Sequence, residues 1–112
     1  MNHKDILRDL KAKKYAPVYF LQSAEAYYID IIVDQIEQNV LSEGERSFNQ
    51  VVLYGKESDF KSVIDQSMQF PMMASYRVVI VKEAQEMSTL EKLSDYIANP
   101  SPTTILVLAH KH

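Results

Sequence analysis

The stretch Arg77-Val78-Val79-Ile80-Val81 decides the fold, because it is apolar at every position after its first residue. A strand with one solvated face alternates apolar and polar residues, whereas a strand covered on both faces is apolar throughout. Thr103-Thr-Ile-Leu-Val-Leu-Ala109 has the same buried character. The two runs predict strands at the centre of a parallel sheet that carries helices on both faces.

Strand and helix patterns alternate through the rest of the chain. Short apolar runs bounded by Pro or Gly indicate strands, and apolar residues at i, i+3, i+4 and i+7 indicate helices. Parallel strands require crossover helices, so the alternation predicts an α/β three-layer sandwich. Further strands are expected at residues 18–21 and 48–54. Helices are expected in the basic segment before Pro17, over 25–41 with Ser42-Glu-Gly44 closing it, from Ser58 or Asp59 to Phe70 at the latest, and from the capping box Ser88-Thr-Leu-Glu91 to Pro100.

The bulk composition describes an ordinary small domain. The chain has 112 residues, no cysteine and a formal net charge of -3, which excludes disulfides and gives no electrostatic basis for binding nucleic acid unaided. The sequence has neither a signal peptide nor an apolar run long enough to span a membrane, so we expect a soluble cytoplasmic protein. We expect one domain over 1–112. Because the chain stops after a buried strand, we also expect it to be a fragment of a longer protein.

Nucleotide chemistry is the first function to test in a parallel α/β domain, because phosphates bind where the first strand meets its helix. That junction, residues 22–28, contains neither Gly nor Lys, and Glu25 adds negative charge. A Gly-Lys pair occurs at 55–56, but a P-loop needs Gly at position 50 and Ser or Thr at 57, where the chain has Gln50 and Glu57. We therefore expect no nucleotide site and no cofactor.

Other chemistry-bearing residues give weak signals. Glu83 follows the third strand as a metal-holding carboxylate would, but without a phosphate loop we interpret it as structural or solvated. His3, His110 and His112 have no nearby cysteine or carboxylate in a metal-ligand pattern, so we expect no metal. No nucleophile stands beside a base, and we expect no catalytic residue.

An apolar segment, Met68-Gln-Phe-Pro-Met-Met-Ala-Ser75, stands where a polar connection between a helix and a strand is expected. Pro71 stops the helix, so Met72 and Met73 fall in a turn or an irregular piece near the surface. Two interpretations remain open. Phe70 and the methionines could fill the core under the sheet edge, or they could form a protruding plug for a partner's apolar pocket.

These residues resemble the N-terminal domain of one family, the delta subunit of the bacterial DNA polymerase III clamp loader. The resemblance covers essentially the whole chain. The chain departs from the family at Ser23, where Gly is usual, and at Met72-Met73, where Leu and Phe are common. The motifs that carry it are Pro17-Val-Tyr-Phe-Leu21, Phe48-Asn-Gln-Val-Val-Leu-Tyr-Gly55, Phe70-Pro-Met-Met-Ala-Ser75 and Arg77-Val-Val-Ile-Val-Lys82.

The resemblance implies a domain shaped like the ATPase core of AAA+ proteins that has lost its nucleotide site. It implies that Met72 and Met73 insert into a hydrophobic pocket of the beta sliding clamp and open the ring, with Phe70 and Pro71 flanking them. It further implies a role in DNA replication as a polymerase subunit without catalytic residues of its own. The gamma/tau and delta prime subunits would bind regions outside this chain, and DNA would be contacted only by the intact assembly.

Two alternatives to this clamp-binding function stay open on the residues alone. One is a divergent P-loop-like enzyme that binds nucleotide through unusual contacts. The other is an orphan α/β protein-interaction domain whose methionines belong to the core.

Overall fold

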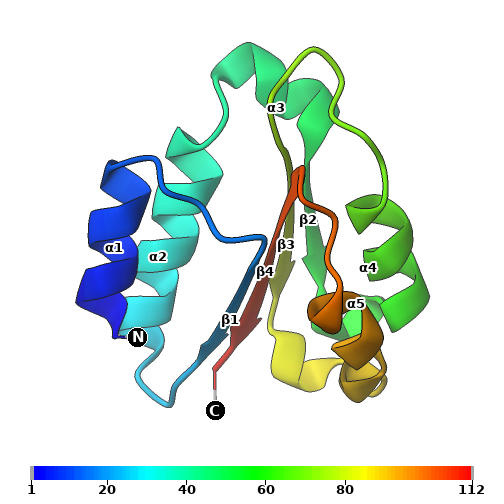
Figure 1. Cartoon of the computed structure of the whole chain (residues 1–112). Helices are drawn as coiled ribbons and strands as arrows, with labels where there is room; N and C mark the ends of the chain where they lie inside the picture. The colour runs from blue at the N-terminus through cyan, green and yellow to red at the C-terminus, as the bar shows by residue number, and fades with distance from the viewer. Residues whose placement is uncertain (1, 112) are drawn as a thin grey trace.

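In the computed structural model, which describes residues 2–111, four parallel strands form one sheet between two layers of helices (Figure 1). The strand order is β1-β4-β3-β2, so the two apolar runs lie at the centre, as the sequence predicts. Register pairs Val79 with Leu106 and Ile80 with Val107. The predicted α/β fold is thus confirmed. The strands are β1 (Val18–Gln22), β2 (Gln50–Tyr54), β3 (Arg77–Lys82) and β4 (Thr104–His110).

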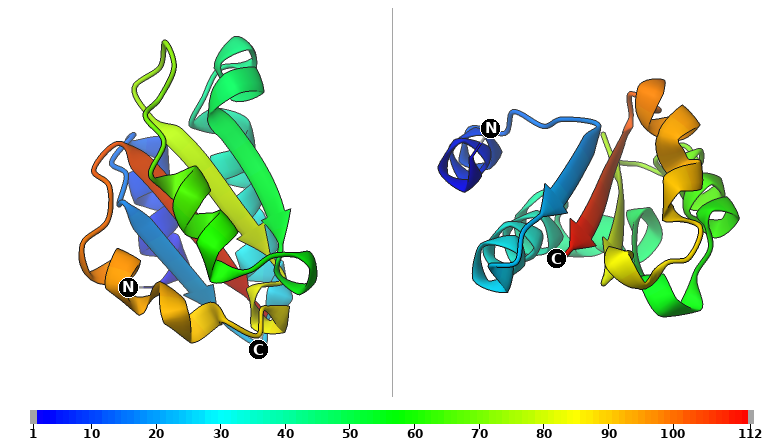
Figure 2. Two further views of the ribbon diagram at one scale, coloured as in Figure 1. Left: turned by 90° about the vertical axis from the view of Figure 1, so that its right-hand side faces the viewer. Right: turned by 90° about the horizontal axis from the view of Figure 1, so that it is seen from below.

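The helices cover both faces of the sheet (Figure 2). On one face lie α1 (His3–Lys11) and α2 (Ala26–Asn39); on the other lie α4 (Phe60–Ser67), the 3-10 helix η3 (Leu90–Leu93) and α5 (Ser94–Ala98). Side chains alternate across a strand, so the two faces of β3 join different cores. Val78 and Ile80 pack in the core with α2, whereas Val79 and Val81 pack in the core with α4 and η3. The unbroken apolar run therefore fills two cores at once.

One helix was not predicted. We expected Ser42-Glu-Gly44 to end the long helix and residue 48 to begin a strand, but α3 (Glu43–Asn49) occupies this segment and β2 begins only at Gln50. Ser42 and Glu45 form a reciprocal capping box, in which the Ser42 hydroxyl accepts from the Glu45 N–H at 3.3 Å and the Glu45 carboxylate accepts from the Ser42 N–H at 2.8 Å. Phe48 thus belongs to a helix.

The capping box predicted at Ser88–Glu91 does not form. Thr89 precedes η3 without a side-chain capping bond, and its hydroxyl instead accepts from the Phe60 N–H at 3.0 Å. The continuous helix that we expected is therefore a 3-10 turn followed by the short α5. By contrast, Asp59 caps α4 as predicted, accepting from the Ser62 N–H at 3.0 Å.

The end of the first helix and the segment that follows β2 also differ from expectation. The first helix ends at Lys11 rather than at Pro17, and Lys13 follows it in the left-handed region at φ 58°. Gly55 begins a 3-10 helix, η1 (Gly55–Glu57), and the backbone of Glu83 lies where a side chain at position 55 would stand. Within residues 2–111, no helix has the length and apolar character to cross a membrane.

Candidate protein-interaction site

Residues 68–76, here called the apolar loop, join α4 to β3 and project beyond the end of the sheet (Figures 1 and 2). Phe70 is 85% exposed, Met72 60% and Met73 96%. These side chains therefore do not fill the core beneath the sheet edge. The loop precedes β3, so it lies at the amino edge of the parallel sheet, opposite the carboxyl edge where α/β domains hold phosphates.

A second segment adds an aromatic side chain near the apolar loop. Phe48 lies in the last turn of α3 with 67% of its surface exposed, and α3 lies beside the apolar loop at the same end of the molecule (Figure 2). Sequence reasoning missed Phe48 because it assigned the residue to a strand. The Ser42-x-x-Glu45 capping pattern was the signal that could have placed it on a helix.

Asn49 connects α3 to the apolar loop through its fully buried side chain. Its Oδ1 accepts from the Met72 N–H at 2.5 Å, and its Nδ2 donates to the Met72 carbonyl at 2.8 Å. Nδ2 also donates to the Glu45 carbonyl of α3 at 3.0 Å. One side chain thus binds both backbone groups of Met72 and the end of a helix.

Two other buried polar residues hold the base of the apolar loop. Arg77 donates from Nε to the Gln66 carbonyl at 2.7 Å and from Nη1 to the Phe48 carbonyl at 3.3 Å. Thr104 on β4 donates its hydroxyl to the Ser67 carbonyl at 2.7 Å. Burial lowers the pKa of the Arg77 guanidinium from its ordinary value. These bonds satisfy carbonyls at the ends of α3 and α4, where a helix leaves them without partners.

The apolar loop returns to the core after its exposed tip. Ala74 and Tyr76 pack against the core on the α2 face, and the Tyr76 ring meets Tyr15 edge-on at 5.4 Å between centroids. Pro71 is partly buried. Met73 lies in the left-handed region at φ 56°, which is rare for a residue with a side chain. The structure therefore brings Phe70, Met72 and Met73 together on a loop that is fixed at both ends.

At the carboxyl edge of the sheet, where a nucleotide would bind, the turn after β1 is held by the chain's own hydrogen bonds. The Ser23 hydroxyl accepts from the Glu25 N–H at 2.9 Å, and the Ser23 N–H donates to the His110 carbonyl at 3.1 Å. Where a phosphate loop would wrap its ligand, Ser23 therefore forms a tight turn against β4.

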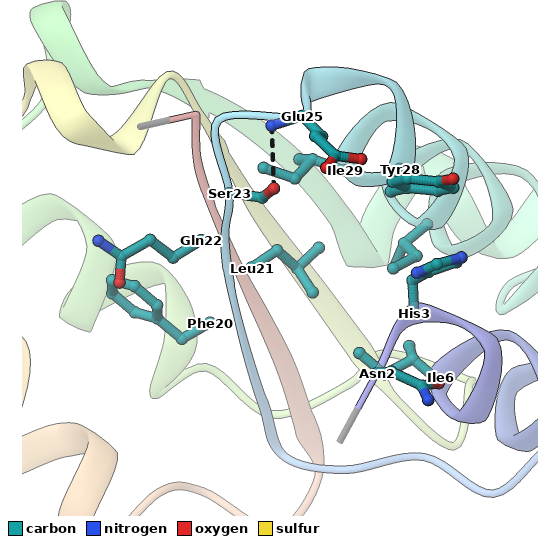
Figure 3. A pocket seen from close by; sticks show the side chains of 11 residues that line it. Asn2, His3, Ile6, Phe20, Leu21, Gln22, Ser23, Glu25, Tyr28 and Ile29 are labelled. Carbon is teal, nitrogen blue, oxygen red and sulfur yellow. Dashed lines mark hydrogen bonds between the residues drawn. The ribbon is translucent and has the colours of Figure 1, made fainter.

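Figure 3 shows a cavity of about 460 Å³ beside this turn, between the start of α1, the end of β1 and the start of α2. His3 and Tyr28 stack at its mouth with ring centroids 3.8 Å apart. Of the 11 residues that line the cavity, none is lysine or arginine, and Glu25 adds a carboxylate. The side chains that line the cavity thus offer a phosphate no lysine or arginine.

Ion pairs link residues at the carboxyl ends of β3 and β4 to α2. The Lys111 ammonium lies 2.9 Å from Asp30 on α2 and 3.7 Å from Glu83 after β3, and its hydrogen bond with Asp30 raises its pKa. Lys82 pairs with Glu37 at 3.3 Å. Glu83, which we interpreted as structural or solvated, therefore takes part in a partly exposed ion-pair network.

The two histidines that the structure describes make different aromatic contacts. His3 stacks on Tyr28, whereas His110 lies beside Phe20 on β1, and His112 lies outside the described residues. Over residues 2–111, the structure contains no group of three His, Asp or Glu side chains arranged to hold a metal ion.

Similar proteins were found by family model, by sequence and by structure. The family model described as "DNA polymerase III, delta subunit" matches residues 19–112. DNA polymerase III subunit delta of Bacillus subtilis (strain 168) is 31% identical over 114 residues, which cover 93% of this chain and 33% of that protein. The solved structure of the Bacillus subtilis DNA clamp loader delta protein (YqeN) superposes with a TM-score of 0.86 at 28% identity, over 98% of this chain and 35% of that one. This chain thus spans about a third of the length of these relatives.

Proposed function

This chain belongs to the DNA polymerase III delta subunit family, and we propose that it is the sliding-clamp-binding module of a replicative clamp loader. The apolar loop is the binding element. Met72 and Met73 enter an apolar pocket on the clamp, and Phe70 and Pro71 flank them and shape the surface. Engagement of the pocket opens the clamp ring or holds it open.

The observation that carries the proposal is the exposure of the loop's apolar side chains, above all Met73 at 96%. Large apolar side chains that leave water on binding contribute about 1.5 to 3 kcal/mol each. A few such anchors dominate the binding energy of a modest interface, because the surrounding contacts are near neutral. Phe70, Met72 and Met73 are of the size and kind that act as anchors.

The turn that Ser23 forms at the carboxyl edge supports a role without nucleotide chemistry. The Ser23 turn occupies the place of a phosphate loop, and the neighbouring cavity has no basic side chain in its lining. A divergent nucleotide-binding enzyme is therefore the weaker candidate. Titration calorimetry with ATP and Mg²⁺ tests it, because stoichiometric binding would favour that enzyme over the clamp-binding module.

The proposal extends to the assembly in which the chain works. We assign residues 1–112 to a single N-terminal AAA+-like domain of a longer delta subunit. The gamma/tau and delta prime subunits bind through regions outside this chain, and DNA is contacted by the assembled loader. In DNA replication the domain binds the sliding clamp, and the catalytic steps belong to other subunits.

The experiment that tests the function compares two variants in binding to the cognate sliding clamp. Met72→Ala combined with Met73→Ala should weaken binding by a factor of about 100, since two anchors are truncated. Tyr54→Ala is the matched control, because Tyr54 is an exposed aromatic residue at the opposite edge of the sheet. Unchanged affinity of the double variant overturns the proposal.

A further inference from the structure

The amide of Asn49 has one orientation that fits its surroundings. Its oxygen faces the Met72 N–H, and its NH2 group faces the carbonyls of Met72 and Glu45. The reversed amide would place an oxygen against two carbonyls and hydrogens against an N–H. Asn49 therefore makes two specific hydrogen bonds to the peptide groups of Met72, a residue 23 positions away in the sequence.

The peptide groups that Asn49 binds immediately precede the strained residue of the apolar loop. Met73 has φ 56°, a conformation that costs a residue with a side chain about 1 to 3 kcal/mol and persists only where its surroundings hold it. Met73 cannot be held by packing of its own side chain, which is 96% exposed. The restraint comes from its neighbours: Ala74 packs against the core on one side, and on the other side Asn49 binds both backbone groups of Met72.

We propose that Asn49 is a positioning residue, which holds Met72 and Met73 in their projecting conformation before the partner arrives. The inference rests on the proposed function, because it concerns how the same loop meets the clamp. A loop that is ordered in the free protein loses less conformational freedom on binding, so more of its contact energy appears as affinity. Asn49 contributes to clamp binding without touching the clamp.

The test uses Asn49→Asp, which keeps the size of the side chain and the acceptor for the Met72 N–H. The oxygen that replaces Nδ2 faces the carbonyls of Met72 and Glu45, so the two hydrogen bonds that Nδ2 donates are lost. The control is Val81→Ala, a truncation of a buried side chain near the carboxyl end of β3, in the core on the α4 face. Asn49→Ala, which removes both bonds, serves as the second variant.

Two measurements follow each variant: hydrogen exchange of the Met72 amide, and affinity for the cognate clamp. In the parent protein we expect the Met72 amide to be protected, although its side chain is exposed. In both Asn49 variants we expect the protection to be lost and the Kd for the clamp to rise about tenfold, whereas Val81→Ala changes neither.

The outcomes separate this inference from the proposed function. Parental clamp affinity in both Asn49 variants, together with lost binding in the Met72→Ala/Met73→Ala variant, overturns the positioning role and leaves the function standing. Parental affinity in all of them overturns the proposed function and the inference that rests on it. An unprotected Met72 amide in the parent protein overturns the positioning role alone.

Discussion

The guanidinium of Arg77 lies against Gln66 and bonds both its backbone and its side chain, Nε to the carbonyl at 2.7 Å and Nη2 to Oε1. The third bond, from Nη1, reaches the carbonyl of Phe48 on α3. Arg77 is the first residue of β3 and is buried. One cation thus joins the ends of two helices to the central sheet, directly below the apolar loop.

Replacing Arg77 should therefore destabilise the protein. Arg77→Met keeps an apolar stem but leaves the Gln66 and Phe48 carbonyls without their donor, and we expect unfolding to become easier by about 2 to 3 kcal/mol. Urea denaturation measures the change. Arg8→Ala is the control, because Arg8 makes only exposed ion pairs with Asp5 and Asp9 and should cost less than about 1 kcal/mol. Equal losses in the two variants would contradict the role of Arg77.

Phe48 should contribute to clamp binding although it lies outside the apolar loop. Phe48 is 67% exposed on α3, which lies at the same end of the molecule as the apolar loop, so under the proposed function the clamp would contact it too. We expect Phe48→Ala to raise the Kd about tenfold while the urea midpoint stays unchanged. Tyr27→Ala removes an aromatic residue of similar exposure from the first turn of α2, at the other edge of the sheet, and should leave affinity unchanged.

The fold was predictable from the sequence because its signals are local. The apolar runs of β3 and β4 specify strands covered on both faces, and this fixes the three layers whatever the exact ends of the helices. Local signals fail where tertiary contacts decide between identical patterns. Ser42-x-x-Glu45 and Ser88-x-x-Glu91 are the same motif, yet only the first forms a capping box, because the Thr89 hydroxyl binds the Phe60 N–H of α4.

The apolar loop was predictable because its signals are also local. The hydrogen bonds that hold it were not predictable. Pro71 beside Phe70 and the methionines marks an apolar turn from composition alone. The hydrogen bonds between Asn49 and Met72 join residues 23 positions apart, and the bond from Arg77 to the Phe48 carbonyl joins residues 29 positions apart. No periodicity or motif in the chain indicates such pairs, since they exist only once β2 and β3 lie side by side.

The N-cap of α4 should make stability depend on acid. Hydrogen bonding from the Ser62 N–H lowers the pKa of Asp59 below its ordinary value of 3.8. The stabilisation is therefore present above pH 3.8 and is lost as the pH falls through the lower pKa of the folded state. Asp59→Asn keeps a capping oxygen but cannot titrate, so its melting temperature should fall less steeply between pH 4 and about pH 2 than that of the parent protein. Parallel pH profiles of the two proteins would contradict the assignment.

The two glycines of the chain should respond in opposite ways to alanine. A Cβ on Gly55 would lie 2.1 Å from the Glu83 carbonyl oxygen and 3.0 Å from its carbon, and these are backbone atoms that cannot turn away. We expect Gly55→Ala to lower the free energy of unfolding by about 2 to 4 kcal/mol, because η1 and the turn after β3 must separate. Gly44→Ala is the matched control. A Cβ there meets nothing within 4 Å, and Gly44 lies inside α3, where alanine restricts the unfolded chain and favours the helix by about 0.5 to 1 kcal/mol. Urea denaturation of both variants gives the two signs, and a neutral Gly55→Ala would mean that Gly55 and Glu83 do not approach as closely as described.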